Sequence, residues 1–412
     1  MSTSREHSFP RAEPSRVAEA VALGVILFTV AWALLHTGFW DRSQIVDTPV
    51  YEGYGEAMLD GQVPYRDFEL EYPPAALPVF VLPALTRSDD YTAAFELLMW
   101  ACGVAIVVAL GLILASLEAS GPRVFGAICF FALAPLALGS VILSRYDLWP
   151  AALTVAALAA LVGGRERLGL GILGLAVAAK IYPLVLLPVA LVWLARRRGT
   201  REMWVGLACF AGVLATCFLP FLLIAPGGVA HSIGHQLGRP LQIESLGASL
   251  LLAAHQLGLY EATVESSHGS QNLSGALPDA IASIQTAFQV VAVGLAWAFF
   301  ARRSRGREDV LLASAAAVTA FVAFGKVLSP QFLIWLLPLV PLVAGATGLA
   351  AAGLFGVALV TTQLWFPFRY WDVVALEPAG WLVFVRDLML VGLFAILLLG
   401  LSRRGRAAPR SA

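Results

Sequence analysis

The sequence has 412 residues, of which 59% are hydrophobic and only 13% are charged, whereas a soluble domain is about 25% charged. This composition excludes a cytosolic enzyme and is typical of a protein that lies in a lipid bilayer. The 27 basic and 27 acidic residues balance, and no long basic face is present, which excludes a nucleic-acid partner. The four cysteines lie in apolar stretches without a CxxC pair, so neither a disulfide scaffold nor a zinc site is expected.

Apolar runs predict about twelve transmembrane helices. A bilayer core needs about 20 apolar residues per helix, and six runs reach this length, at residues 17–39, 92–117, 124–143, 203–225, 281–301 and 382–401. Six shorter runs, divided by Gly, Pro or charged residues, cover 148–163, 168–182, 183–196, 309–326, 330–344 and 349–366. Bulky residues follow the first run, so it is expected to be an uncleaved anchor. The expected fold class is an all-α polytopic membrane protein, and residues 1–412 are expected to form a single domain.

The basic residues predict the orientation, because short cytoplasmic loops are enriched in Lys and Arg. With both ends inside, 18 of the 27 basic residues fall in cytoplasmic segments, which include the tails 1–16 and 402–412. Residues 41–90 lie on the opposite side and hold ten acidic residues against three arginines. Two large loops, 40–91 and 226–280, are therefore expected to be extracytoplasmic.

An apolar segment inside the first loop, residues 73–85, carries four prolines and is about 13 residues long. It is too short to cross a bilayer, so we expect an interfacial or re-entrant helix. Such a helix could cover the loop or form a wall for a lipid-borne substrate.

The two lysines of the chain are candidate binding residues, since charges inside apolar segments are costly and often functional. Lys180 and Lys326 are each followed closely by a proline that interrupts the helix. Each could neutralise a phosphate that enters from the lipid, or could simply extend to the interface. Ser329 and Gln331 add hydrogen-bonding capacity beside Lys326, which favours a ligand there.

Other polar residues stand at the ends of apolar runs or in the second loop. Arg145 and Asp147 form a short hinge and could bind a substrate or satisfy each other, and Arg386 with Asp387 could likewise be an interfacial ion pair. In the second loop, His235, Arg239, Gln242 and Glu244 offer donors and acceptors to a polar substrate. His231 and His235 are four residues apart, but Ser232 stands where a zincin would need Glu, so zinc is not expected.

The order of five motifs resembles that of the GT-C glycosyltransferases, specifically glycosyltransferase family 87. The motifs are the first-loop sequence DTPVYEGYGEAMLDGQVPYRDFELEYPP, the hinge SRYDLWP, and the segments AAKIYPLVLLP, RPLQIES and FGKVLSPQFLIWLLPL. The family includes α-mannosyltransferases that use polyprenyl-phosphate-linked sugars. The resemblance covers nearly the whole chain and implies a GT-C-type bundle with two large extracytoplasmic loops.

The resemblance implies an essential acid ahead of the GxxPY turn, a position that Asp47 occupies. Asp67 and Glu69 are the alternatives among the ten acids of this loop. Some relatives have Asp-x-Asp at this point, but Thr48 and Pro49 follow Asp47 here, so no metal is expected to be required. The resemblance further implies that basic residues bind the donor phosphate, with Lys180, Arg239, Lys326 and Arg386 as candidates. Tyr51 and Tyr65 are candidate substrate-binding residues of the same loop.

These inferences predict an inverting transfer of a hexose, with mannose as the family-level expectation. The donor would be a polyprenyl-phosphate-linked sugar, and the acceptor a glycolipid or glycan on the outer face of the cytoplasmic membrane. Asp47 would accept the proton of the acceptor hydroxyl, and cations would stabilise the leaving phosphate. No cofactor is expected. The alternatives are a lipid-linked sugar flippase or secondary transporter, and a retaining or metal-dependent transferase of another GT-C family.

Overall fold

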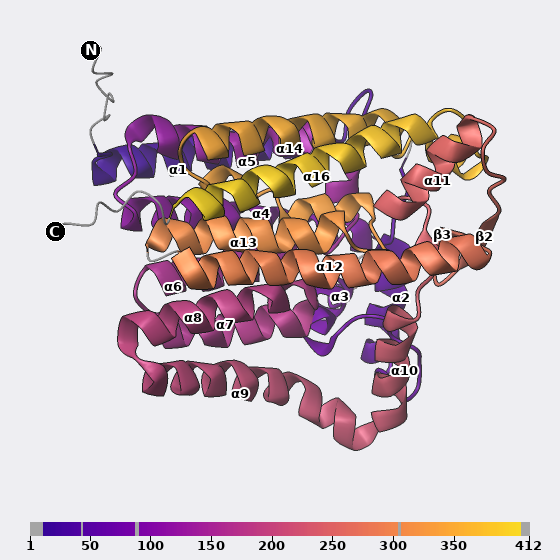
Figure 1. Ribbon diagram of the computed structural model, residues 1–412. Coiled ribbons are helices and arrows are strands. Elements are labelled where there is room, and N and C mark those ends of the chain that lie inside the picture. The colour runs from indigo at the N-terminus through magenta and orange to yellow at the C-terminus, as the bar shows by residue number, and fades with distance from the viewer. Residues whose placement is uncertain (1–10, 43, 87–89, 304–305, 405–412) are drawn as a thin grey trace, which may run out of the picture.

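The computed structural model describes residues 11–42, 44–86, 90–303 and 306–404, and shows a bundle of long helices (Figure 1). In chain order the α-helices are α1 (Pro14–Leu34), α2 (Thr48–Leu59), α3 (Leu77–Ala84), α4 (Tyr91–Ser116), α5 (Gly121–Leu138), α6 (Leu148–Val162), α7 (Glu166–Ala179), α8 (Leu187–Arg198), α9 (Thr200–Ile224), α10 (Pro226–Leu237), α11 (Leu246–Gln256), α12 (Ala276–Arg303), α13 (Arg307–Ala323), α14 (Gly345–Trp365), α15 (Tyr370–Val374) and α16 (Gly380–Arg403). Short 3₁₀ helices are η1 (Pro74–Ala76), η2 (Ser140–Ile142), η3 (Tyr182–Leu186), η4 (Pro330–Trp335) and η5 (Val340–Leu342). The strands are β1 (Leu241–Gln242), β2 (Val264–Ser267) and β3 (Ser270–Leu273).

Each of the twelve predicted apolar runs coincides with a helical element. Within the described residues, seven helices are long and apolar enough to cross a membrane: α1, α4, α5, α9, α12, α14 and α16. The run 330–344 is different from the expectation, because it forms the 3₁₀ helices η4 and η5 in place of a continuous α-helix. Pro330, Pro338 and Pro341 fall within this run, and a proline lacks the N–H that an α-helix interior requires.

The short helix α13 is the most enclosed part of the bundle. Almost every residue from Asp309 to Ala323 is buried, because its Ala, Ser and Val side chains let neighbouring helices approach on all sides. A helix surrounded by protein does not need the length of a lipid-facing span. The run 309–326 is therefore a core helix, which explains its small length.

The polar elements gather at one end of the bundle, opposite the chain termini (Figure 1). This loop end contains α2, α3, α10, α11 and α15 together with a small antiparallel sheet of order β1-β3-β2. The sheet was not predicted, and it adds only three short strands to a mainly helical chain. The predicted short helix at 73–85 is present as η1 followed by α3.

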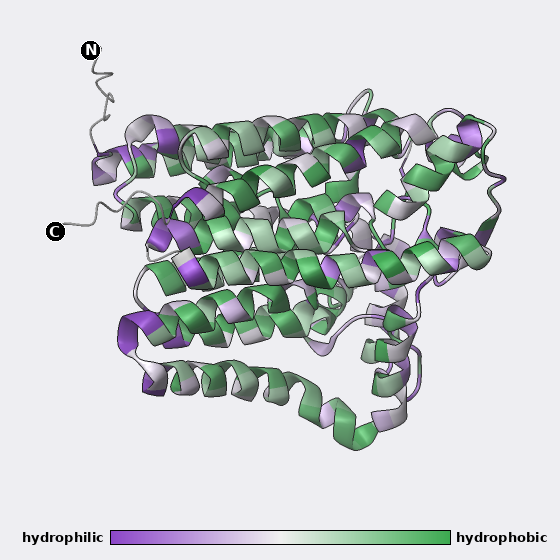
Figure 2. Cartoon of the chain, viewed as in Figure 1, coloured by the Kyte–Doolittle hydropathy of each residue, from purple (hydrophilic) through white to green (hydrophobic). Residues whose placement is uncertain are grey.

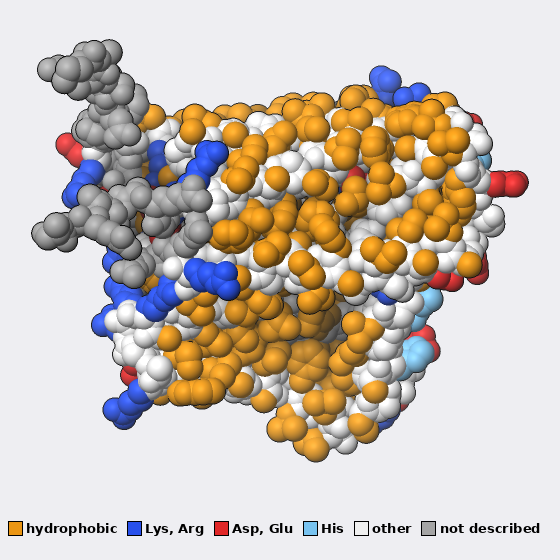
Figure 3. Space-filling view, in the orientation of Figure 1, with side chains coloured by type: hydrophobic (Ala, Val, Ile, Leu, Met, Phe, Trp, Pro, Cys, Tyr) orange, Lys and Arg blue, Asp and Glu red, His pale blue; other side chains and the backbone are white. Residues whose placement is uncertain are grey.

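Arginines mark the other end. Arg123 pairs with Glu308 at 2.6 Å, and Arg404 pairs with Asp309 at 3.1 Å. Figures 2 and 3 show an apolar band along the long helices between this arginine-rich end and the more acidic loop end. The band is the surface that a bilayer would contact. Parts of the predicted tails 1–16 and 402–412, with Arg5, Arg406 and Arg410, lie outside the described residues, as do Arg87, Asp89 and Arg305.

Candidate active site

Asp47 lies directly before α2, where Pro49 in the first turn favours the start of a helix. Its carboxylate forms an ion pair with Arg145, and the Tyr51 hydroxyl donates to Oδ2 at 3.4 Å. Arg145 comes from the turn before α6 and also donates to the Ile45 carbonyl at 3.2 Å. The Asp47 side chain remains 28% exposed, whereas that of Arg145 is only 7% exposed. The first loop and the hinge therefore meet at an accessible carboxylate.

A second ion pair lies next to the first, on the same hinge. Asp147 is fully buried, and its Oδ1 accepts hydrogen bonds from Lys180 Nζ and Trp335 Nε1, each at 2.6 Å. The Lys180 ammonium also lies 4.4 Å from the centroid of the Tyr146 ring. Lys180 terminates α7, and the chain continues into η3 through Pro183. The interruption of the helix thus holds the lysine against a carboxylate and an aromatic face.

A strip of polar residues links the second loop to the segment after α13. The Gln242 backbone N–H donates to the Lys326 carbonyl at 3.0 Å, and Lys326 Nζ donates to the Leu237 carbonyl at 3.0 Å. The Gln242 side chain donates to Glu244 and, at 2.8 Å, to Ser329 Oγ. Arg239 donates to Ser270 Oγ at 3.0 Å. The sequence motifs RPLQIES and FGKVLSP are therefore in direct contact.

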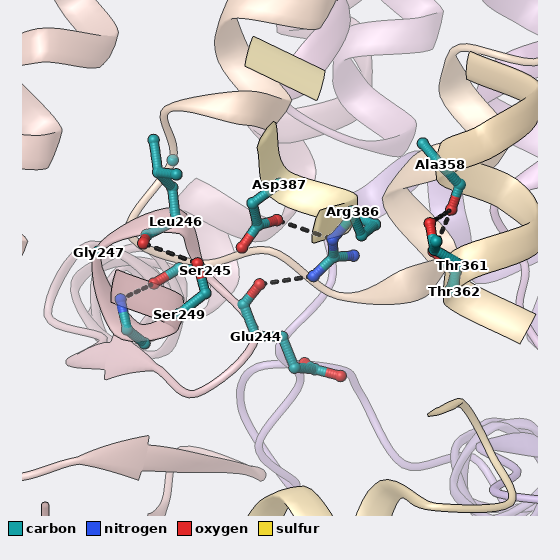
Figure 4. A network of polar contacts seen from close by, with 12 residues as sticks. Glu244, Ser245, Leu246, Gly247, Ser249, Ala358, Thr361, Thr362, Arg386 and Asp387 are labelled. Carbon is teal, nitrogen blue, oxygen red and sulfur yellow. Dashed lines mark hydrogen bonds and ion pairs between the residues drawn. The ribbon is translucent and has the colours of Figure 1, made fainter. Parts of the chain in front are cut away.

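Arg386 lies behind this strip and is fully buried (Figure 4). Its guanidinium donates to the Glu244 carbonyl at 2.6 Å, and its Nε lies 2.7 Å from Asp387 Oδ1. The guanidinium carbon also lies 5.6 Å from the Trp365 ring centroid. These contacts hold the Glu244 backbone in place, and they leave Arg386 without an exposed surface for a ligand.

Charge interactions connect these groups into one site. The charges of Arg145 and Arg239 act on Lys180, and those of Arg145, Arg239 and Arg386 act on Glu244. Burial raises the pKa of Glu244 to about 7, although the arginines and the Ser329 hydroxyl oppose this shift. Burial also lowers the pKa of Arg145 to about 10 and lowers that of Arg239. The site is thus rich in cations, and of the carboxylates near them Asp147 and Glu244 are enclosed whereas Asp47 is accessible.

A pocket of about 410 Å³ lies between residues 65–71 and α10. The predicted residues Tyr65 and His235 line it, together with Glu69, Glu71 and His231. His231 Nε2 lies 3.8 Å from Glu69, and His235 Nε2 lies 3.9 Å from Glu71. The charge of Glu71 also acts on Arg239, which places this pocket beside the cation-rich site.

A separate apolar cavity of about 330 Å³ is lined by Ala211, Leu214, Ala215 and Phe218 of α9. Figure 3 shows a hollow with apolar walls on this part of the surface. Leu214 and Phe218 also pack against Ala178 and Ala179, which directly precede Lys180. An apolar surface therefore extends from α9 to the end of α7.

The structure brings most of the predicted residues to the loop end, and it adds one that the sequence reasoning missed. Trp335 donates to Asp147, but within the apolar run FLIWLLP its indole gave no signal of a polar role. Gln331 lies half-buried on η4, next to Phe332, whose ring centroid is 5.8 Å from Lys180 Nζ.

In the described part of the chain, no group of three or more His, Cys, Asp or Glu side chains could hold a metal ion. The role of Asp47 and the metal independence both stay predictions.

Comparison with known proteins places the chain in a known family. The family model described as glycosyltransferase family 87 matches residues 70–330. The crystal structure of ArnT from Cupriavidus metallidurans bound to undecaprenyl phosphate is similar in fold, with a TM-score of 0.50 and 14% sequence identity over 96% of this chain and 79% of that chain. The apo structure of the same ArnT gives a TM-score of 0.46 at 14% identity, over 95% of this chain and 77% of that chain. No curated protein matches the sequence.

The fold likeness and the family match agree with the predicted GT-C-type membrane bundle, and the family match covers more than half of the chain. The motifs LEYPP, SRYDLWP, AAKIYPL and RPLQIES all fall inside the matched residues. The predicted family resemblance is therefore confirmed, and the chain belongs to glycosyltransferase family 87.

Proposed function

We propose that this glycosyltransferase moves a hexosyl residue from a polyprenyl-phosphate-linked donor to a hydroxyl of a glycolipid or glycan acceptor. Mannose is the sugar that the family resemblance favours. The whole chain, residues 1–412, would act as one unit, with its active site at the loop end on the outer face of the cytoplasmic membrane. The ArnT structure bound to undecaprenyl phosphate supports a lipid-phosphate donor, because this chain shares its fold.

The observation that carries the proposal is the position of Asp47 beside a group of cations. Arg145 pairs with Asp47 directly, and Lys180 and Arg239 lie within electrostatic reach of one another. A phosphate monoanion or dianion would be stabilised here, because charge interactions are strong in a site that excludes water. The apolar cavity on α9 is suited to the polyprenyl chain of such a donor.

In this mechanism the donor phosphate binds Lys180 and Arg145, and Arg145 thereby exchanges the carboxylate of Asp47 for the phosphate. Asp47 is then free to accept the proton of the acceptor hydroxyl. The hydroxyl oxygen forms a bond to the anomeric carbon on the face opposite the leaving group. The bond from that carbon to the phosphate oxygen breaks, and polyprenyl phosphate departs with the electron pair. A single displacement of this kind inverts the anomeric configuration.

The test uses the full-length protein in lipid nanodiscs, with polyprenyl-phosphomannose as donor and octyl α-D-mannopyranoside as acceptor. Asp47→Asn should lower the transfer rate at least about a hundredfold, the usual size of a general-base contribution. It should not weaken donor binding, because Arg145 is released from its ion pair with Asp47. Asp41→Asn is the matched control, since Asp41 is an exposed acid of the same loop.

The outcomes separate the parts of the proposal. A full rate in Asp47→Asn removes Asp47 as the base. Loss of transfer with EDTA would contradict the predicted metal independence. Transfer from a glucosyl or galactosyl carrier, but not from the mannosyl carrier, would replace mannose by that hexose. Movement of the lipid-linked sugar across a vesicle membrane without transfer would support the flippase alternative.

A further inference from the structure

The pocket between residues 65–71 and α10 has a rigid frame. Gly228 of α10 lies so close to the first loop that a Cβ there would overlap the Tyr65 carbonyl oxygen. The Tyr65 hydroxyl donates to the Tyr72 carbonyl at 2.6 Å, and its ring packs edge-on against Phe221. The two walls of the pocket are therefore fixed to each other and to α9.

The charge inside this pocket is unevenly distributed. Among the described residues that line it, the only Lys or Arg is Arg66, which forms hydrogen bonds of 2.9 and 2.8 Å with the Asp67 carboxylate. Glu69 and Glu71 lie 3.8 and 3.9 Å from the imidazoles of His231 and His235, and the charge of Glu71 also acts on Arg239. A phosphate or carboxylate on a ligand would meet net negative charge here. Hydroxyl groups would find acceptors in the carboxylates, and either donors or acceptors in the imidazoles.

The pocket also adjoins the proposed base. Tyr72 follows Glu71, and the Tyr72 ring centroid lies 5.7 Å from that of Tyr51. The Tyr51 hydroxyl in turn donates to Asp47. The charge of Glu71 also acts on Arg239, and that of Arg239 acts on Lys180, so a molecule held by Glu71 would lie on the α10 side of the cation-rich site.

We infer that this pocket binds the acceptor and selects an uncharged, hydroxyl-rich sugar ring over a phosphorylated one. The inference rests on the proposed function and adds the chemical class of the acceptor to it. Cations around Lys180 and Arg145 would take the anionic donor, and the acidic pocket would take the neutral acceptor. The negative charge of the pocket would exclude the donor phosphate. The neutral acceptor would form no ion pair with the cations and would lose the competition for that position to the donor.

Binding is tested first, without any transfer. Saturation-transfer NMR on the full-length protein in nanodiscs would use octyl α-D-mannopyranoside and its 6-phosphate as probes. The neutral glycoside should bind the wild type, and the phosphorylated one should not. The double variant Glu69→Gln/Glu71→Gln should weaken binding of the neutral glycoside about tenfold, the size expected when two hydrogen-bond acceptors are replaced. The same variant should admit the phosphorylated glycoside.

The control Glu56→Gln/Asp60→Asn removes the same charge from two exposed positions, one on α2 and one directly after it, and should leave both affinities unchanged. Methyl α-D-mannopyranoside distinguishes a free glycan from a lipid-borne one: equal binding of the methyl and octyl glycosides would assign a soluble acceptor. Failure of the wild type to bind either neutral glycoside, or equal loss in both double variants, would overturn the inference.

Transfer is measured second, so that failure of the proposed function can be recognised separately. With the polyprenyl-phosphate donor, Glu69→Gln/Glu71→Gln should raise the KM for the glycoside about tenfold and change the KM for the donor less than twofold. If the glycosides bind as expected but no polyprenyl-phosphate hexose supports transfer, the pocket assignment stands and the proposed donor is wrong. A rise in the donor KM instead would move the donor to this pocket and overturn the inference.

Discussion

Arg145 and Asp47 form an ion pair that joins the segment before α2 to the turn before α6. Arg145 is almost fully enclosed, whereas Asp47 keeps access to solvent. A flat guanidinium can hold a carboxylate and a phosphate in turn through two parallel N–H groups. Under the proposed mechanism, the pair would be a resting arrangement that an incoming donor phosphate opens.

Arg145→Lys tests this role. A lysine keeps the charge but loses the fork of donors, so we expect transfer to fall about tenfold, and about a hundredfold in Arg145→Met. Donor affinity should fall in the same order, which a titration with polyprenyl phosphate would measure. Arg42→Met is the control, because Arg42 is an exposed arginine of the first loop that does not line the proposed acceptor pocket. Equal donor affinity in all these proteins would contradict a phosphate contact at Arg145.

The Lys180–Asp147 pair should follow the rule for buried ion pairs, in which removal of one partner strands the other charge. Lys180→Met and Asp147→Asn should each lower the free energy of unfolding by about 3 kcal/mol. The double variant should be more stable than either single variant, because no unpaired charge remains. Thermal unfolding in detergent would measure the stability of each variant. Arg167→Met is the control, because Arg167 belongs to an exposed ion pair with Glu202. Additive losses in the double variant would contradict the coupling.

Arg386→Met should destabilise the protein by about 3 kcal/mol, because Asp387 would stay buried without its counter-charge. Arg386→Met/Asp387→Leu should recover most of the stability but not the activity, since the Glu244 carbonyl still loses its donor. A melting curve and a transfer assay on the same samples would separate the two effects. Recovery of full activity in the double variant would show that the contact with Glu244 is dispensable.

Glu244 should make stability depend on pH. Burial raises its pKa from 4.5 in a free side chain to about 7 in the folded protein, so the folded state holds the proton more tightly. Between these two values the unfolded state binds fewer protons, and the free energy of unfolding falls as pH rises. Relative to Glu244→Gln, the wild type should lose up to about 3 kcal/mol between pH 4.5 and 7. Melting temperatures of both proteins across this range would measure it, and a constant difference between them would contradict it.

Gly228 offers a test of the pocket frame with a control in the same helix. Gly228→Ala would drive a methyl group into the Tyr65 carbonyl, whereas Gly234→Ala would place one in open space. We expect Gly228→Ala to lose about 2 kcal/mol of stability and to raise the acceptor KM. Gly234→Ala should be neutral or slightly stabilising, since Ala favours a helix over Gly. Similar melting temperatures in the two variants would contradict the close approach.

The fold was largely predictable because hydropathy is a local property. Every predicted apolar run forms a helical element. The run at 309–326 is shorter than a membrane span because α13 is enclosed by the other helices of the bundle. The segment 330–342 was predicted less well, since its prolines favour 3₁₀ turns over an α-helix while its hydropathy resembles that of a span. The strands at 241–273 are too short to show an alternating pattern.

The sequence indicated candidate residues better than it indicated their partners. Lys180 was a candidate because charges are rare in apolar segments, and Asp147 because it lies in the hinge between two of them. Trp335 was missed because its contact with Asp147 joins distant segments. Arg386 was expected at the donor phosphate and is instead buried against the Glu244 carbonyl, 142 positions away in sequence. Such pairings depend on the folded chain and leave no trace in a local pattern.

The helix α9 has a consequence for how the protein is handled. Only 6% of its most apolar stretch is buried inside the protein, so we expect fatty acyl chains to form most of its surroundings in a bilayer. Harsh delipidation removes those chains and exposes Trp204 and Leu223. Bound lipid or detergent must therefore cover α9 in the purified protein, and the choice of extraction medium determines how well α9 is covered.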